Sequence, residues 1–423
     1  MKISPARIAA FDILLRVEND RAFSSVLLPA FEEGLLPADR GLCHELVLGT
    51  LRRQIYLDKV IDTLSGGKRL DMAVRIAVRL GLHQLLFLDR IPDHSAVNES
   101  VNLVQRAKKT SAKGFVNAML RRVLREQLPV LNYADDLERL SVETSHPCWL
   151  LEKWTEEFGL EEAGLIADAN NQFPAQAFRS IDGSSISVDR SIPSKFVEGC
   201  YLLGRDSDAA SVVRSEELYF QDEGSQIVAA AVRVPAGGRF LDVCASPGGK
   251  TGYIGSHTRA GYVFAGDLYW QRLEMLRDNC RRQRVNAQIV QYNAESSLPF
   301  ENSTFDAVFV DAPCSGTGTI RHNPEIRYFL EPEDIAMLAN KQRAILNNAS
   351  KLVTHGGSLV YSTCSLEIEE DEEICRQFLA EKGEFDLARP NVDQRFVTPD
   401  GFARTFPHRD GMDGFFIAEF RRR

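Results

Sequence analysis

The chain has 423 residues, more than one hydrophobic core usually organises, so two or three domains are expected. Its 44% hydrophobic and 26% charged residues are typical of a globular protein in water. No stretch approaches the roughly 20 consecutive apolar residues of a membrane span, which argues against a membrane protein.

The eight cysteines form no Cys-x-x-Cys pair, which argues against a zinc site or a disulfide framework. The first residues lead into an amphipathic segment and do not resemble a signal peptide. We therefore expect a cytoplasmic protein with reduced thiols, no membrane partner and a monomeric state.

Residues 1–130 show helical periodicity and almost no strand pattern, so an all-helical domain is expected. Apolar residues recur at helical spacing, for example Ile13, Leu14 and Val17. Residues 1–125 carry a net charge of +7, whereas the remainder of the chain carries −16. Residues 101–125 contain seven basic residues and no acid, a pattern that favours contact with nucleic-acid phosphates but also fits a solvated helix.

Residues 131–222 combine a helix that begins near His146 and ends near Gly159 with a strand at 178–181, which predicts a small α+β subdomain. From residue 223 to 423, short apolar runs alternate with helical segments. Strands are expected at 239–243, 262–267, 287–290, 307–310 and 358–361. The fold class is therefore α/β, with a doubly wound, mostly parallel sheet.

Two cysteines occur in similar places, each after a strand of this sheet. Cys314 follows Asp311-Ala312-Pro313, and Cys364 follows Ser362-Thr363. Ligands of open α/β sheets bind at the carboxyl ends of the strands. Two thiols and the carboxylate of Asp311 could therefore meet over one substrate, an arrangement suited to covalent attack on a ring carbon.

Small residues follow the first strand, and an acid, Asp267, ends the second strand. Such a pattern indicates a nucleotide-like cofactor, since the backbone can approach it at a helix start and the acid can accept from ribose hydroxyls. NAD(P), ATP and S-adenosyl-L-methionine are the candidates. The turn matches neither GxGxxG nor GxxxxGK[ST], because position 244 is a cysteine. Residues 247–249 could also simply turn the chain.

Residues 240–251, the Asp311–Gly316 motif and the Ser362–Ser365 motif together closely resemble the Nol/Nop/Sun family of RNA cytosine-C5 methyltransferases. Residues 221–226 and 406–416 match further motifs of that family. The first 130 residues, notably 4–11 and 39–53, resemble the NusB family of RNA-binding helical domains. The resemblance implies three parts: a NusB-like domain at 1–130, a small α+β subdomain at 131–222, and a Rossmann-like S-adenosylmethionine-dependent methyltransferase domain at 223–423.

The resemblance also implies roles for four side chains. The thiol of Cys364 would attack cytosine C6, and Cys314 would assist release of the product. Asp311 would hydrogen-bond the N3 or amino edge of the base, and Lys250 would hold an active-site carboxylate or the base itself.

Contacts with S-adenosyl-L-methionine are implied for the loop after the first strand and for polar residues at or after other strand ends. These residues are Val243, Cys244, Ala245, Ser246, Pro247, Gly248, Gly249, Asp267, Asn293 and Asp311. One position departs from the family pattern, which commonly has an acid that accepts from the adenine amino group. Asn293 stands at that place and can still accept one hydrogen bond.

The pairing of a NusB-like domain with this catalytic domain implies RNA as the partner, with 16S ribosomal RNA as the expected substrate. Transfer RNA, a DNA cytosine-C5 methyltransferase and a non-enzymatic RNA-binding assembly factor are the alternatives. An acidic run follows Cys364, and we expect it to be the solvated start of a helix, where acids favour the helix dipole. Its members are Glu367, Glu369, Glu370, Asp371, Glu372 and Glu373.

Overall fold

The computed structural model describes residues 3–126, 128–182, 188, 190–204, 212 and 215–423. The chain divides into two compact units. The helical unit comprises residues 1–172 together with Ile320–Leu330, and the sheet unit comprises Phe173–Thr319 together with Glu331–Arg423. This division into compact units does not test the domain boundaries expected near residues 130 and 222, which stay predictions. No helix of the described residues is long and apolar enough to span a membrane.

The first seven helices of the helical unit are amphipathic, and their apolar faces form one core. Ile13, Leu14 and Val17 are buried there, as their helical spacing predicts. Asp71 caps one of these helices by accepting a hydrogen bond from the Ala73 amide. The helices are α1 (Pro5–Asp20), α2 (Ser24–Glu32), α3 (Pro37–Arg52), α4 (Gln54–Ser65), α5 (Met72–Phe87), α6 (Asp93–Arg106), α7 (Lys113–Arg125), α8 (Asp136–Thr144), α9 (Cys148–Phe158), α10 (Leu160–Asn170) and α15 (Ile326–Phe329).

The segment Ile320–Leu330 belongs to the helical unit although it lies between two parts of the sheet unit in the chain. Glu325 accepts from the Ser24 amide at 2.6 Å, and the Tyr328 hydroxyl donates to the Leu51 carbonyl at 2.6 Å. The buried Arg327 donates to the side chain of Asn171 at 3.0 Å. These polar contacts explain why a segment so distant in sequence packs with the helices.

The basic stretch 101–125 covers the end of α6, a short 3-10 turn and α7. Acids from elsewhere in the helical unit neutralise part of it, because Arg106 pairs with Asp12 and Lys109 pairs with Asp71. Other bases of the stretch are exposed and form no ion pair with any described residue. These are Lys108, Arg121 and Arg125. The exposed positive charge is thus smaller than the sequence suggests, but it is present.

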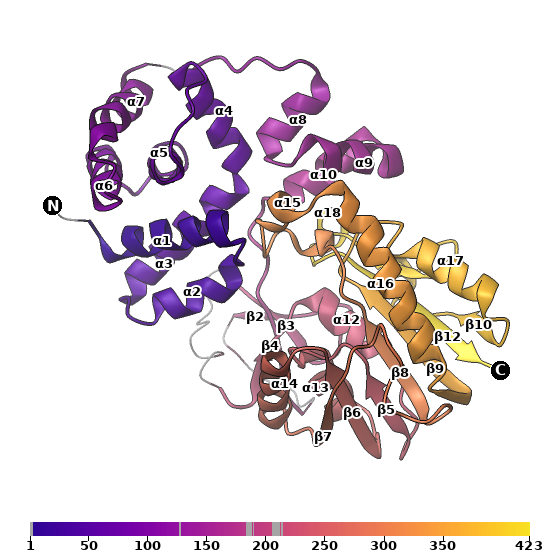
Figure 1. Ribbon diagram of the computed structural model, residues 1–423. Helices are drawn as coiled ribbons and strands as arrows, with labels where there is room; N and C mark the ends of the chain where they lie inside the picture. Colours follow the sequence, from indigo (N-terminus) through magenta and orange to yellow (C-terminus); the bar gives the residue numbers. More distant parts are fainter. Residues whose placement is uncertain (1–2, 127, 183–187, 189, 205–211, 213–214) are drawn as a thin grey trace. The chain divides into compact units, whose positions relative to one another are not determined.

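The sheet unit contains a central sheet with the strand order β10-β12-β9-β8-β5-β6-β7, and β11 pairs with β12 (Figure 1). Five neighbouring strands are parallel to one another, in the order β9, β8, β5, β6 and β7. Strands β10, β11 and β12 are antiparallel to their neighbours. The strands are β5 (Arg239–Asp242), β6 (Tyr262–Asp267), β7 (Ala287–Gln291), β8 (Phe305–Asp311), β9 (Val353–Thr363), β10 (Phe385–Ala388), β11 (Ala403–Thr405) and β12 (Phe415–Arg422). This is the expected doubly wound, mostly parallel sheet.

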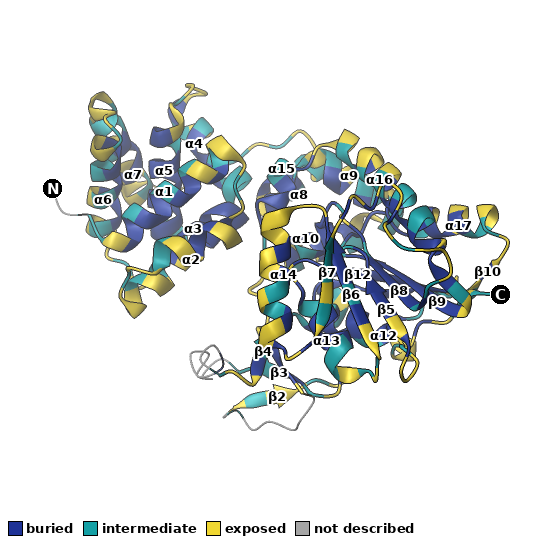
Figure 2. Ribbon diagram, turned by 60° about the horizontal axis from the view of Figure 1, so that its bottom comes forward, coloured by how far each residue is buried: buried dark blue, intermediate teal, exposed yellow. Residues whose placement is uncertain are grey.

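Helices cover both faces of this sheet, so its central strands, such as β8, are buried on both sides, whereas the edge strand β7 is not (Figure 2). On β8, Val308 packs in the core that α16 and α17 share, whereas Phe309 packs with residues of α12 and α13. A smaller antiparallel sheet has the order β2-β3-β1-β4. The remaining elements are β1 (Ala177–Ser180), β2 (Ser191–Pro193), β3 (Cys200–Leu203), β4 (Leu218–Phe220), α12 (Glu223–Ala231), α13 (Gly249–His257), α14 (Trp270–Arg282), α16 (Pro332–Ser350), α17 (Glu372–Glu381) and α18 (Pro407–Asp410).

The strand order reverses between β5 and β8, since β5 continues to β6 on one side and β8 continues to β9 on the other. Such a reversal separates the connections that leave neighbouring strands and opens a crevice at their carboxyl ends. Asp242 ends β5 and Asp311 ends β8. The topology therefore places these two carboxyl groups at the crevice.

Candidate active site

The two cysteines singled out by the sequence lie side by side. Asp311 of β8 is in register with Ser362 of β9, so the loops that follow the two strands begin at the same edge of the sheet. The sulfur atoms of Cys314 and Cys364 are 3.4 Å apart, a distance at which one thiol can donate to the other. The hydrogen bond to Cys364 and burial raise the pKa of the Cys314 thiol well above its ordinary value. Cys314 therefore rests with its proton.

A lysine and a carboxylate adjoin the thiol pair. Nζ of Lys250, in the first turn of α13, lies 2.6 Å from Oδ2 of Asp311, and the Ser362 hydroxyl donates to Oδ1 at 2.8 Å. Burial opposes the charge of Lys250, but Asp311 and Cys364 outweigh it and raise the lysine's pKa. Lys250 is therefore a fixed cation between a carboxylate and a thiol. Its ammonium also lies 5.0 Å from the centre of the Phe415 ring.

The loop after β5 lines a pocket of about 260 Å³ together with Lys250 and Asp311. Gly248 adopts a φ of +101°, and a Cβ there would lie 2.9 Å from a Leu276 methyl carbon, so only glycine fits comfortably. The Ser246–Pro247 peptide bond is cis. Of the seven loop residues predicted to contact the cofactor, five line this pocket: Cys244, Ala245, Ser246, Pro247 and Gly249.

Asp242 is buried beneath this pocket and has one unpartnered oxygen. The Thr251 hydroxyl donates to its Oδ2 at 2.6 Å, whereas Oδ1 has no hydrogen-bond partner among the described residues. Burial raises the pKa of Asp242 to about 7. A buried acceptor, acidic strand ends and glycine backbone suit a cofactor rich in hydroxyl and amino donors. The residues present therefore fit S-adenosylmethionine.

Two further predicted cofactor residues end neighbouring strands. Asp267 is buried at the end of β6, where it accepts from the Tyr269 amide at 3.3 Å and lies 3.7 Å from Arg272. Asn293 follows β7 and is exposed, but its side-chain oxygen accepts from the Glu295 amide at 3.0 Å. Asn293 would have to share that oxygen with a ligand, and its role as an adenine contact stays a prediction.

The backbone around Cys364 is held by two glycines. The Gly318 amide donates to the Cys364 carbonyl at 2.9 Å, and the Gly414 amide donates to the Gly318 carbonyl at 2.8 Å. A Cβ on Gly318 would lie 2.1 Å from the Gly414 carbonyl oxygen. The two backbone segments can therefore approach each other this closely only because residue 318 has no side chain. The loops carrying Cys314 and Cys364 are thus linked through backbone atoms.

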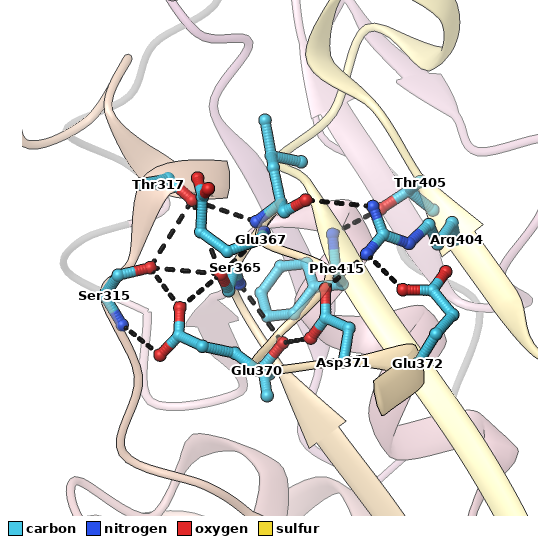
Figure 3. Close-up of polar contacts among 12 residues, drawn as sticks. Ser315, Thr317, Ser365, Glu367, Glu370, Asp371, Glu372, Arg404, Thr405 and Phe415 are labelled. Atoms are coloured by element: carbon cyan, nitrogen blue, oxygen red, sulfur yellow. Dashed lines mark hydrogen bonds and ion pairs between the residues drawn. The ribbon is translucent and has the colours of Figure 1, made fainter. Parts of the chain in front are cut away.

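The expectation that the acidic run after Cys364 is solvated is wrong for three of its members. Glu367, Glu370 and Asp371 have 0% exposure, and Figure 3 shows the last two among hydroxyl groups and an arginine. Only Glu372 and Glu373 lie in the first turn of α17, where acids favour the helix dipole. The local sequence suggested solvent because the donors that make burial tolerable come from distant segments.

Two hydrogen-bonded groups surround these buried acids. Glu370 accepts from Ser315, Ser365 and Gln342. Asp371 accepts from the Thr363 hydroxyl at 2.5 Å and pairs with Arg404 at 2.6 Å. None of these contacts was foreseen. The available sequence signal was that both cysteines, Cys314 and Cys364, are followed directly by a serine.

Comparisons with known proteins agree with this architecture. Residues 230–421 match the family described as 16S rRNA methyltransferase RsmB/F, and residues 4–125 match the NusB family. A Bacillus subtilis protein named "Probable ribosomal RNA small subunit methyltransferase B" is 32% identical over 450 residues and is covered completely, as is this chain. Ribosomal RNA small subunit methyltransferase B of Erwinia tasmaniensis is 32% identical, with 97% of each chain covered.

The chain belongs to the ribosomal RNA small subunit methyltransferase B family. The crystal structure of PH0851 shares the fold, with a TM-score of 0.84, 24% identity and 99% of each chain covered. Membership confirms the expected methyltransferase fold, the NusB-like helical domain and S-adenosyl-L-methionine as the cofactor.

Proposed function

We propose that this protein methylates C5 of a cytosine in small-subunit ribosomal RNA through a transient bond between the Cys364 sulfur and C6. Family membership supports the substrate and the cofactor. The observation that carries the chemistry is the juxtaposition of the two sulfurs, 3.4 Å apart, with a lysine whose charge is held by Asp311. A passive RNA-binding factor would need none of these groups.

Cytosine C5 is a weak nucleophile, and addition of a thiolate to C6 makes it enamine-like. The Lys250 ammonium interacts electrostatically with Cys364, so a cation stands beside the sulfur that would attack C6. Asp311 would hydrogen-bond the N3 or amino edge of the base and stabilise charge that develops on the ring. When bound, S-adenosylmethionine supplies the methyl group that C5 accepts. Asp267 would accept from its ribose hydroxyls, and residues 243–249 would present backbone to it.

Release requires loss of the C5 proton and cleavage of the bond between C6 and Cys364. The electron pair of the C5–H bond restores the 5,6 double bond, and the pair of the C6–S bond returns to sulfur. Cys314 rests as a thiol within hydrogen-bonding distance of Cys364. Its sulfur would accept the C5 proton while its own proton passes to the departing sulfur, so both cysteines end as thiols.

The test uses the full chain, unmodified 16S ribosomal RNA and S-adenosylmethionine with a labelled methyl group. Wild-type protein should label C5 of one cytosine, detected by bisulfite sequencing. The Cys364→Ala variant should form no covalent RNA complex on a denaturing gel, whereas Cys314→Ala should accumulate it. A complex that requires Cys314 and not Cys364 would reverse the assigned roles.

The same assay distinguishes the alternative substrates and functions. Labelling of transfer RNA in preference to ribosomal RNA would replace the proposed substrate. Absence of S-adenosylmethionine binding in calorimetry would favour a non-enzymatic assembly factor and overturn the proposal.

A further inference from the structure

One buried carboxylate contacts the residue that follows each of the two cysteines. Glu370 lies between the end of β9 and the start of α17 and has 0% exposure. It accepts from the Ser315 amide at 2.9 Å and from the Ser315 hydroxyl, and from the Ser365 hydroxyl at 2.5 Å (Figure 3). Ser315 directly follows Cys314, and Ser365 directly follows Cys364, so a single side chain joins both loops.

A glutamine completes the link on the other side of Cys314. Nε2 of Gln342, from α16, donates to Glu370 at 2.8 Å and to the Pro313 carbonyl at 3.0 Å. Cys314 is therefore held on both sides, through Pro313 and through Ser315, by groups attached to the same carboxylate. The two serine hydroxyl oxygens are also 3.0 Å apart.

The hydrogen-bonding pattern suits an acceptor with no donor of its own. A carboxylate offers about four lone-pair positions, and four donors reach Glu370. Glu370 forms no ion pair with any described residue, because the nearby Arg404 pairs with Asp371 and Glu372 instead. Burial raises the pKa of Glu370, and the hydrogen bonds from both serines and Gln342 oppose that rise.

We propose that Glu370 is a positioning residue that sets the separation of the Cys314 and Cys364 sulfur atoms. It acts through Ser315 and Ser365 and touches neither the RNA nor the cofactor. Its effect on turnover rests on the proposed function, since the two thiols must cooperate only if Cys364 forms an adduct and Cys314 releases it. Its effect on the sulfur separation does not rest on that function.

The matched variants are Glu370→Gln and Glu372→Gln. Glutamine keeps the size of Glu370 but replaces one acceptor oxygen by an N–H₂ donor, so the four donors that now reach the carboxylate cannot all be kept in place. Glu372 undergoes the same chemical change two residues later, where it pairs with Arg404, and Arg404 keeps its pair with Asp371.

The first measurement needs no RNA. Oxidised glutathione converts two neighbouring thiols into a disulfide and is itself reduced to two glutathione molecules. Mass spectrometry of tryptic peptides follows the Cys314–Cys364 disulfide, with mixed-disulfide formation at the exposed Cys148 as an internal reference. Glu370→Gln should slow formation of the Cys314–Cys364 disulfide at least tenfold, while Glu372→Gln should stay within twofold of wild type.

The second measurement is turnover on ribosomal RNA. Glu370→Gln should lower kcat about 10- to 100-fold with KM for RNA and S-adenosylmethionine binding unchanged, which a general loss of folding would not produce. Disulfide formation and kcat both within twofold of wild type would overturn the proposal. If Glu370→Gln does not fold, Ser315→Ala and Ser365→Ala replace it, and the proposal is wrong if neither slows the disulfide. Should methylation occur at another atom, the disulfide measurement still decides the positioning role.

Discussion

Two polar clusters adjoin the thiol pair, and their carboxylates differ in access and in charge partner. In the pocket cluster, Asp311 is paired with Lys250, and its side chain keeps 28% exposure. In the buried cluster, Glu370 has 0% exposure and is held by neutral donors. An accessible, charge-paired carboxylate can meet a substrate, whereas an enclosed one can only hold its neighbours. On the proposals above, a carboxylate takes part in the reaction on one side of the thiol pair and positions the cysteines on the other.

The largest effect should come from Asp311→Asn, which removes the accessible charge. Lys250 loses its anionic partner, and the base loses a charged acceptor, so kcat should fall roughly 100- to 1,000-fold. Steady-state methylation of ribosomal RNA measures it. Ser362→Ala removes one neutral hydrogen bond to the same carboxylate and should cost about tenfold or less. Equal effects of the two variants would show that the charge of Asp311 is unimportant.

The next effect is on stability and concerns Arg404, which pairs with the buried Asp371. Arg404→Met leaves the fully buried Asp371 without its ion-pair partner and should lower the free energy of unfolding by about 3 to 5 kcal/mol. Urea denaturation measures the change. Arg423→Met breaks an exposed pair with Asp386 and should leave the free energy of unfolding nearly unchanged, because solvent screens that pair. A small loss for Arg404→Met would mean that Asp371 is neutral in the folded protein.

A smaller effect is a pH dependence that Asp242 imposes. Its folded-state pKa of about 7 lies above its unfolded value, so the folded protein keeps a proton that the unfolded chain releases first. The contribution of Asp242 to the free energy of unfolding is therefore complete at low pH and is lost as the pH rises toward 7. Between pH 5 and 7, wild type should lose about 2 kcal/mol relative to Asp242→Asn. Parallel urea midpoints of the two proteins across that range would contradict the assignment.

The pocket cluster could be predicted from the sequence and the buried cluster could not, for a physical reason. Cys314, Asp311 and Cys364 follow apolar runs directly, and the rule that parallel strands end at one edge brings them together without further information. Glu370 lies six residues after Cys364 in a run of acids, where local composition indicates solvent. Its burial depends on Gln342 and Ser315, whose approach only the folded chain reveals.

The helical unit shows the same difference between local patterns and contacts from distant segments. Helical spacing correctly predicted the buried positions of α1, because the apolar residues of an amphipathic helix lie on the face that packs against the core. No local pattern showed that Ile320–Leu330 would pack with these helices, since Glu325 and Arg327 find their partners in residues more than 150 positions away. Likewise, Arg106 and Lys109 pair with acids that lie outside the basic stretch 101–125, so the sequence of that stretch could not reveal these pairs.

An effect of similar size on stability tests the backbone link between the loops that carry Cys314 and Cys364. Gly318→Ala places a Cβ 2.1 Å from the Gly414 carbonyl oxygen and 2.9 Å from the Cys364 carbonyl oxygen, so backbone must shift. Such overpacking should cost about 1 to 3 kcal/mol in unfolding free energy. Gly383→Ala is the matched control, because nothing lies within 4 Å of its added Cβ.

The activity of Gly318→Ala should fall more than its stability suggests, because one of the two carbonyls that the added Cβ crowds belongs to Cys364. We expect at least a tenfold lower rate of adduct formation, measured on denaturing gels at a temperature where the variant remains folded. If the rate matched that of Gly383→Ala, the close approach of Gly318 and Gly414 would be a packing feature alone. The position of the Cys364 sulfur would then depend on the buried carboxylate and its two serines, without help from this backbone contact.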